Sequence, residues 1–231
     1  ISVVLKKAEL IYTKLRKPEL AIRCLSNVLN KKESASIAKY LIKIYLDQDK
    51  WKEAEELIKK HNLRYDEYEE RMLTAKEDYL NLEIYWNNKI QKDRTNLTYL
   101  AGYSHALLLQ NKFAEAYDFC AEALKSLPRY TGILAINYYL AKQMNKGRIT
   151  AEPNINRMAS SDEESFVTAA ACYMKNDHKM TDKADQIIIN LLNKDFSCLE
   201  YILHCYVFKK YIPKKEIDDR IISKLNYISI T

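Results

Sequence analysis

Glycine and proline are scarce in this sequence, and their scarcity restricts the folds that it can adopt. Only 3 glycines and 4 prolines occur among the 231 residues. Tight turns, hairpins and bulges depend on them, because glycine tolerates positive φ angles and proline fixes φ at a value that suits turns. A fold rich in β-sheet needs many such turns. The composition therefore favours an all-α fold.

Several functional motifs are also missing. Gly102, Gly132 and Gly147 lie far apart, whereas phosphate-binding loops and dinucleotide-binding fingerprints need clustered glycines. No serine or cysteine stands in a recognisable nucleophile motif, which leaves only a triad assembled from distant residues as an alternative. No apolar run approaches the roughly 18 residues that indicate a membrane-spanning helix. We therefore expect no catalytic residues, no cofactor and no membrane association in this chain.

The 5 cysteines and 4 histidines show no metal-binding spacing. Cys198 and Cys205 are seven residues apart and would share a helix face, but no third or fourth ligand stands at helical spacing from them. The cysteines lie inside apolar patterns, which favours reduced core thiols over a metal site. Reduced thiols in turn predict an intracellular, cytoplasmic protein.

The charged residues are mixed in sign along the chain. Lysine and arginine number 37 against 31 aspartates and glutamates, which gives a net charge of +6. Interspersed charges are typical of a solvated helical surface, whereas nucleic-acid-binding proteins concentrate basic residues in a stripe. The 18 tyrosines could stack bases beside lysines, but most stand at core-facing positions, which favours packing. Nucleic acid is therefore not the expected partner.

Apolar residues recur at three- and four-residue spacing along most of the chain, which predicts about twelve helices. Pro18 is expected to open a helix, because proline is tolerated in a first turn, and Asn96 is expected to cap another. Asp66 followed by Glu69 resembles a capping box, and Thr181 is a further candidate cap. Near the end of the chain, the pattern predicts two helices over residues 198–211 and 213–227.

A helix-turn-helix unit occurs twice at the start of the chain. Tyr12 and Ala21 are nine residues apart, as are Tyr45 and Ala54, and the second pair follows the first by 33 residues. A small residue on the second helix lets the first helix pack closely, with the tyrosine filling the space beside it. One such hairpin cannot bury its apolar face alone, so the repetition predicts stacked neighbours.

A third unit covers residues 96–128, and together the three units resemble tetratricopeptide repeats. The family's pattern of about 34 residues has large and small residues at fixed positions of its two helices. The residues that match it are Tyr12, Ala21, Tyr45, Trp51, Ala54, Phe113, Ala116, Ala123 and Pro128. The family's glycine is replaced by Glu9, Ile42 and Ser104. The resemblance covers residues 1–61 and 96–128, and it implies a right-handed α-α superhelix, or solenoid.

Four stretches follow from this frame. They are two repeats over residues 1–64, an irregular helical unit over 65–95, the best-matched repeat with a following helix over 96–147, and degenerate repeats with a C-terminal cap over 148–231. An apolar stripe runs through residues 66–94 without a glycine or proline, so the segment is either one long helix or a pair broken near Asp78–Asn81. The alternation of antiparallel helices in a solenoid favours the broken pair.

The resemblance also implies where a partner would bind. In tetratricopeptide proteins, fixed positions of the first helices line the concave surface, and here those positions hold Lys6, Lys39, Lys43, Ala101, His105 and Leu108. Lys39 and Lys43 are one turn apart and share a face. We hypothesise a basic N-terminal groove that takes an acidic peptide or a terminal carboxylate. The alternative is a solvated lysine face without a ligand.

The expected function is a scaffold or adaptor that binds a peptide or a partner protein, with self-association through the open ends of the solenoid as a further possibility. The chain begins at Ile1 rather than at a methionine, so we expect it to be part of a longer protein. It could then be an accessory or regulatory domain of an enzyme or transcription regulator. An RNA-binding helical repeat is a second alternative, but it would need the same kind of polar residue at one position of every unit.

Overall fold

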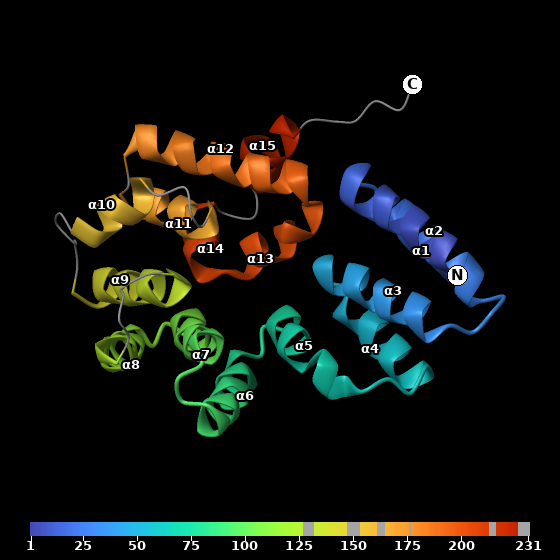
Figure 1. The fold of residues 1–231 in the computed structure, drawn as a ribbon, viewed down its shortest axis with the longest axis horizontal. Coiled ribbons are helices and arrows are strands. Elements are labelled where there is room, and N and C mark those ends of the chain that lie inside the picture. Colours follow the sequence, from blue (N-terminus) through green and yellow to red (C-terminus); the bar gives the residue numbers. More distant parts are fainter. Residues whose placement is uncertain (127–131, 147–152, 161–164, 176, 213–215, 226–231) are drawn as a thin grey trace. The chain divides into compact units, whose positions relative to one another are not determined.

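The computed structural model describes residues 1–126, 132–146, 153–160, 165–175, 177–212 and 216–225 (Figure 1). Within these ranges the secondary structure is helical and no strand occurs, as the scarcity of glycine and proline predicts. The α-helices are labelled α1 to α15. They outnumber the roughly twelve helices that the sequence predicts, in part because residues 198–211, expected to form one helix, are divided between two. The all-α fold is confirmed, whereas the superhelical arrangement stays a prediction.

The chain forms two compact units. Unit 1 contains residues 1–77, 190–203 and 224–231, and unit 2 contains residues 78–189 and 204–223. The helices of unit 1 are α1 (Ser2–Glu9), a π-helical turn (Leu10–Lys14), α2 (Pro18–Leu29), α3 (Ala35–Asp47), α4 (Trp51–Lys60), a 3-10 turn (Tyr65–Glu67), α5 (Glu69–Ala75), a second 3-10 turn (Phe196–Cys198) and most of α13 (Leu199–His204).

Unit 2 holds the longer helices. They are α6 (Tyr79–Lys92), α7 (Leu97–Leu109), α8 (Phe113–Lys125), α9 (Gly132–Lys146), α10 (Pro153–Ser160), α11 (Ser165–Lys175), most of α12 (His178–Lys194), α14 (Tyr206–Tyr211), α15 (Ile217–Arg220) and most of a 3-10 turn (Ile222–Lys224). The break between α5 and α6 confirms that the segment of residues 66–94 is a pair of helices.

Several helix starts follow from the local sequence. Pro18 stands at the first position of α2, where its missing N–H costs nothing. The Ser34 hydroxyl accepts a hydrogen bond from the Ile37 N–H at 3.4 Å. The Asn96 side chain accepts two, from the N–H groups of Thr98 at 3.1 Å and Tyr99 at 3.3 Å. The predictions for Pro18 and Asn96 are therefore confirmed.

Two predicted caps are wrong. Thr181 lies inside α12, and Asp177 caps that helix by accepting from the Met180 N–H at 3.0 Å. Asp66 lies in a 3-10 turn, and its carboxylate accepts from Arg64 at 2.6 Å. A neighbouring arginine competes for the Asp66 carboxylate, and α5 begins at Glu69 without a side-chain cap.

Turns between helices use positive φ angles without glycine. The residues concerned are Arg16 (φ 53°), Asp49 (φ 58°), Asn62 (φ 47°), Glu77 (φ 56°) and Asn111 (φ 59°). In three of these turns, the residue that follows donates its N–H to the carbonyl five residues earlier; these bonds are Lys50 to Tyr45, Leu63 to Ile58 and Lys112 to Leu107. Such bonds close the C-terminus of a helix in the Schellman manner, so a chain with little glycine still makes tight helical hairpins.

The core of unit 1 confirms the packing inferred from the repeat. Ala21 and Ala54 are fully buried, and Tyr12 is 1% exposed. A cluster joins α3, α4 and α5 through Ile42, Leu46, Ala54, Ile58 and Met72. The small residues thus stand where helices approach each other closely.

A buried aspartate ties three segments of unit 1 together. Asp47, at the end of α3, has a side chain that is 1% exposed. Its carboxylate accepts hydrogen bonds from the Tyr12 hydroxyl and from the Arg71 guanidinium, both at 2.5 Å. Tyr12 belongs to the π-helical turn and Arg71 to α5. Charged donors give the shorter and stronger hydrogen bonds in proteins, so this cluster fixes the relative positions of the three segments.

Unit 2 contains an equivalent cluster. Asp185 on α12 accepts hydrogen bonds from the Tyr173 hydroxyl at 2.6 Å and from Arg220 at 2.8 Å. An apolar cluster of the unit lies elsewhere, between α6, α7, α8 and α9, and includes Ile90, Leu100, Ala101, Cys120, Leu124 and Leu134. Ala116, the counterpart of Ala54, is fully buried on α8. The predicted match at Pro128 lies outside the described residues.

Candidate functional site

The three lysines of the hypothesised groove lie in unit 1 and differ in their surroundings. Lys6 and Lys39 are exposed, and Lys43 is half-buried. The Lys39 ammonium already pairs with the Glu67 carboxylate at 2.9 Å, and this hydrogen bond raises its pKa. The Lys43 ammonium lies 6.0 Å from the centre of the Tyr40 ring. At Lys39, a partner would have to compete with Glu67 of the chain itself.

The two apolar residues of the hypothesised groove do not line an open surface. Leu108 is fully buried and Ala101 is 7% exposed. Both lie on α7, against which α6, α8, α9 and α14 pack. A helix that is apolar around its whole circumference is buried on all sides, and the α7 sequence LTYLAGYSHALLL is of that kind. The expectation for Ala101 and Leu108 is therefore corrected: they are core residues.

His105 has a different role from the one expected. Its Nε2 accepts a hydrogen bond from the Tyr206 backbone N–H at 3.0 Å. This N–H is the first of α14, and Cys205, which precedes it, provides no side-chain cap. Burial, together with the positive charges of Lys209 and His204, lowers the pKa of His105 to about 4. The imidazole is therefore neutral near pH 7, as an acceptor must be, and it holds the start of α14 in place.

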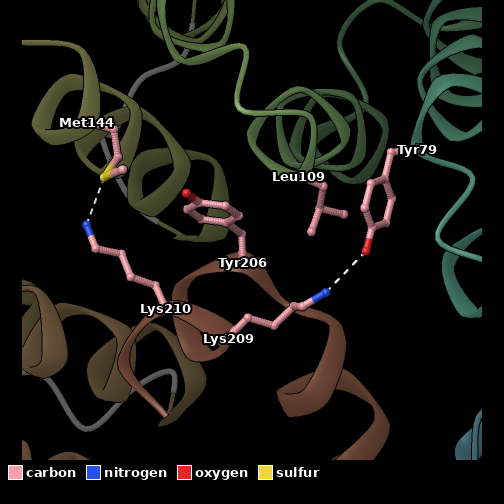
Figure 2. Close-up of a pocket in the computed structure, with 6 residues that line it drawn as sticks. All are labelled: Tyr79, Leu109, Met144, Tyr206, Lys209 and Lys210. Atoms are coloured by element: carbon pink, nitrogen blue, oxygen red, sulfur yellow. Dashed lines mark hydrogen bonds between the residues drawn. The ribbon is translucent and has the colours of Figure 1, made fainter. Parts of the chain in front are cut away.

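A pocket opens in unit 2 beside His105. It has a volume of about 330 Å³ and is lined by Tyr79, Leu109, Met144, Tyr206, Lys209 and Lys210 (Figure 2). These residues come from the start of α6, the end of α7, the C-terminal part of α9, and α14. Four elements of one unit thus build the pocket, and α14, whose first N–H is held by His105, supplies three of the six side chains.

The two lysines of the pocket lie on opposite sides of the Tyr206 ring (Figure 2). The Lys209 ammonium donates to the Tyr79 hydroxyl at 3.1 Å. The Lys210 ammonium donates to the Met144 thioether sulfur at 2.8 Å and lies 5.3 Å from the centre of the Tyr211 ring. A thioether is a weak acceptor. Burial lowers the pKa of Lys210, and within the described residues its ammonium has no carboxylate partner.

The pocket combines apolar and aromatic side chains with two lysines, so both of its charged side chains are positive. Over the described ranges, no group of three or more histidine, cysteine, aspartate or glutamate side chains could hold a metal ion. Burial also raises the pKa of the Cys120 thiol to about 12, so this cysteine stays protonated and is a poor nucleophile.

Sequence reasoning missed Tyr206, Lys209 and Lys210. It assigned residues 198–211 to one helix, whereas the structure ends α13 at His204 and begins α14 at Tyr206. No glycine or proline marks this break. The acceptor of the Tyr206 N–H is His105, which lies 101 positions earlier in the chain. No local sequence pattern indicates such a contact.

No protein-family model matches the chain, and neither a curated protein nor a solved structure matches it. None of the helices in the described part of the chain is both long and apolar enough to cross a membrane.

Proposed function

We propose that this chain is a helical-repeat scaffold or adaptor that binds a segment of a partner protein, and that the pocket of unit 2 is a main point of contact. The observation that carries the proposal is the Lys210 ammonium, which lines an open pocket and meets a thioether where a carboxylate would be expected. Lys209 and Lys210 are both exposed, so an anionic group of a partner can reach both ammonium groups. A carboxylate would offer Lys210 a charge-assisted hydrogen bond in place of a weak thioether acceptor.

The shape of the pocket supports a protein segment as the ligand. A volume of about 330 Å³ is at the lower end of the range for small-molecule sites, roughly 300–1,000 Å³. It can take one large side chain, while the rest of the segment lies on the surrounding helices. Recognition of an extended or helical segment through one anchoring side chain is a common mode of peptide binding. The helical hairpins of the fold, with their resemblance to tetratricopeptide repeats, provide a rigid support.

Selection from a display library of random linear peptides tests the proposal. We expect the folded chain to enrich a group of related sequences, and synthetic copies of them to bind in solution by fluorescence anisotropy. The double variant Lys209→Ala with Lys210→Ala should weaken this binding, and the double variant Lys39→Ala with Lys43→Ala should not. The proposal is wrong if the folded chain enriches no peptide, or if every enriched peptide binds the pocket variant as tightly as the parent chain.

The same experiment also tests whether the basic groove of unit 1 binds the partner. If the lysine pair on α3 rather than the pair on α14 controls binding, the partner uses unit 1, as the sequence alone suggested. The experiment therefore separates the two candidate surfaces within one set of variants.

A further inference from the structure

We infer that the pocket of unit 2 accepts an acidic-apolar-acidic segment, in which one large apolar side chain sits against Tyr206 between two carboxylates. This inference rests on the proposed function and specifies its ligand. The two ammonium groups flank the Tyr206 ring on opposite sides (Figure 2). A carboxylate on each side of one apolar residue would meet both ammonium groups at once.

The apolar element of the ligand follows from the lining. Leu109, Met144 and the rings of Tyr79 and Tyr206 present apolar surface to the pocket. Leu109 is buried and Tyr206 is half-buried, so their positions are set by the packing of the unit. Burial of apolar surface contributes about 25 cal/mol per Å². One side chain of the size of leucine or phenylalanine would cover most of the apolar surface of the pocket.

The acidic elements follow from the unusual environment of Lys210. Elsewhere in unit 2, the Lys112 ammonium meets the Glu83 carboxylate at 2.8 Å, and both groups lie partly out of water. Lys210 is exposed, and its ammonium donates to the Met144 sulfur instead of a carboxylate. An incoming carboxylate offers a charge-assisted hydrogen bond that is about twice as strong as a neutral one. The thioether is the weaker acceptor and is easily exchanged for it.

The separation of the lysines argues against a single phosphate group as the ligand. Phosphate sites gather several donors on one group, commonly backbone N–H groups of a glycine-rich loop or arginine forks. Here the lysines point to different neighbours, Tyr79 and Met144, and the pocket lining includes no arginine and no glycine. Two separate carboxylates match the two separate ammonium groups better than one multivalent anion does.

Fluorescently labelled peptides test the inference directly. The parent peptide carries leucine between two glutamates in a neutral glycine-serine carrier. In one relative both glutamates become glutamine, in a second the leucine becomes serine, and in a third the leucine moves outside the glutamate pair. We expect the parent peptide to bind the whole chain in anisotropy titrations. The glutamine relative loses two charge-assisted bonds, each worth on the order of a tenfold change in affinity, and should bind about 100-fold more weakly. The two relatives with a replaced or displaced leucine lose the buried apolar side chain and should each bind about 10-fold more weakly.

Matched lysine variants locate the binding. Lys209→Met and Lys210→Met keep the length of the side chain and remove its charge, and each should weaken the parent peptide about 10-fold. Lys175→Met removes an exposed charge from α11 of the same unit and should change nothing. Circular dichroism of each variant confirms that it is folded. Should Lys210→Met not fold, Lys210→Arg keeps the charge with a different geometry, and its affinity should lie between those of the parent chain and Lys209→Met.

Several results would overturn the inference. If the glutamine peptide binds as tightly as the parent peptide, or if Lys210→Met leaves affinity unchanged, the acidic elements are wrong. If inorganic phosphate alone displaces the peptide at millimolar concentration, the site is a simple anion site. If a labelled RNA oligonucleotide binds and depends on the same two lysines, the ligand is a nucleic acid. In the first case, peptides from the display selection can still bind elsewhere on the chain, so the proposed function survives while this inference fails.

Discussion

Replacing Asp47 with alanine removes the carboxylate that joins three segments of unit 1. The side chain of Asp47 is 1% exposed, and that of Arg71, its ion-pair partner, is 25% exposed. After the replacement, Tyr12 and Arg71 both lose this acceptor while they remain in a largely buried place. Removing one partner of a buried ion pair costs about 3–5 kcal/mol. Because a quarter of the Arg71 side chain is in contact with water, we expect the lower end, about 3 kcal/mol.

Two companion variants separate the contributions to this loss. Tyr12→Phe removes one neutral-to-charged hydrogen bond and should cost about 1–3 kcal/mol. Asp47→Asn keeps an oxygen that can accept from Tyr12 but removes the charge that pairs with Arg71, and it should cost less than Asp47→Ala. Because Tyr12 and Arg71 share one carboxylate, the effects of Tyr12→Phe and Asp47→Ala should not add.

The chain contains its own reporters for this measurement. It has 2 tryptophans, of which Trp51 packs against the core of unit 1 and Trp86 lies on α6 of unit 2. In a Trp86→Phe background, the fluorescence of Trp51 follows the urea unfolding of unit 1. Globular domains are stable by only about 5–15 kcal/mol, so a loss of about 3 kcal/mol shifts the midpoint clearly. A loss below about 1 kcal/mol, the size expected for an exposed pair, would refute the structural role of the cluster.

Three further predictions concern unit 2. Asn111→Ala should lower the free energy of unfolding by about 1 kcal/mol, and Asn111→Gly should not, because only alanine is penalised at positive φ; urea titration measures both. The pKa of His105 falls from 6.5 to about 4 on folding. The free energy of unfolding should therefore be constant above pH 6.5 and fall as the pH drops towards 4. His105→Asn should flatten this dependence in urea titrations at a series of pH values. Gly102→Ala should destabilise unit 2 by about 1–2 kcal/mol in thermal unfolding. The added methyl group would lie 2.8 Å from the Cζ2 atom of Trp86 and overlap the Trp86 ring. The overpacking, about 1–3 kcal/mol, exceeds the helix-propensity gain of alanine, about 1 kcal/mol.

The features that the sequence predicted are those that depend on near neighbours. Pro18 and Asn96 begin helices because of bonds within one turn, and Ala21 and Ala54 are buried because their spacing repeats. The burial of Leu108 depends on helices that pack around α7 from several sides. No periodicity within α7 specifies which of its faces stays open, because almost every face is apolar.

The pocket could not be predicted for a similar reason. Lys209 and Lys210 face it because α14 starts anew at Tyr206, and that start depends on the imidazole of His105, which comes from α7. The sequence alone predicts His105 to contact a ligand. The structure instead gives it an architectural role next to the site.

The turns at positive φ lead us to expect that the hairpins close late in folding. Asp49 and Asn111 adopt a backbone conformation that costs an ordinary L-residue about 1–2 kcal/mol, so the turns have little tendency to form before the helices that they connect. The bond from the Lys112 N–H to the Leu107 carbonyl, 2.9 Å long, exists only once the end of α7 is helical. We therefore expect folding to start within the helices and at their alanine-lined contacts, with the turns closing afterwards. Substitutions in these turns should change the unfolding rate far more than the folding rate.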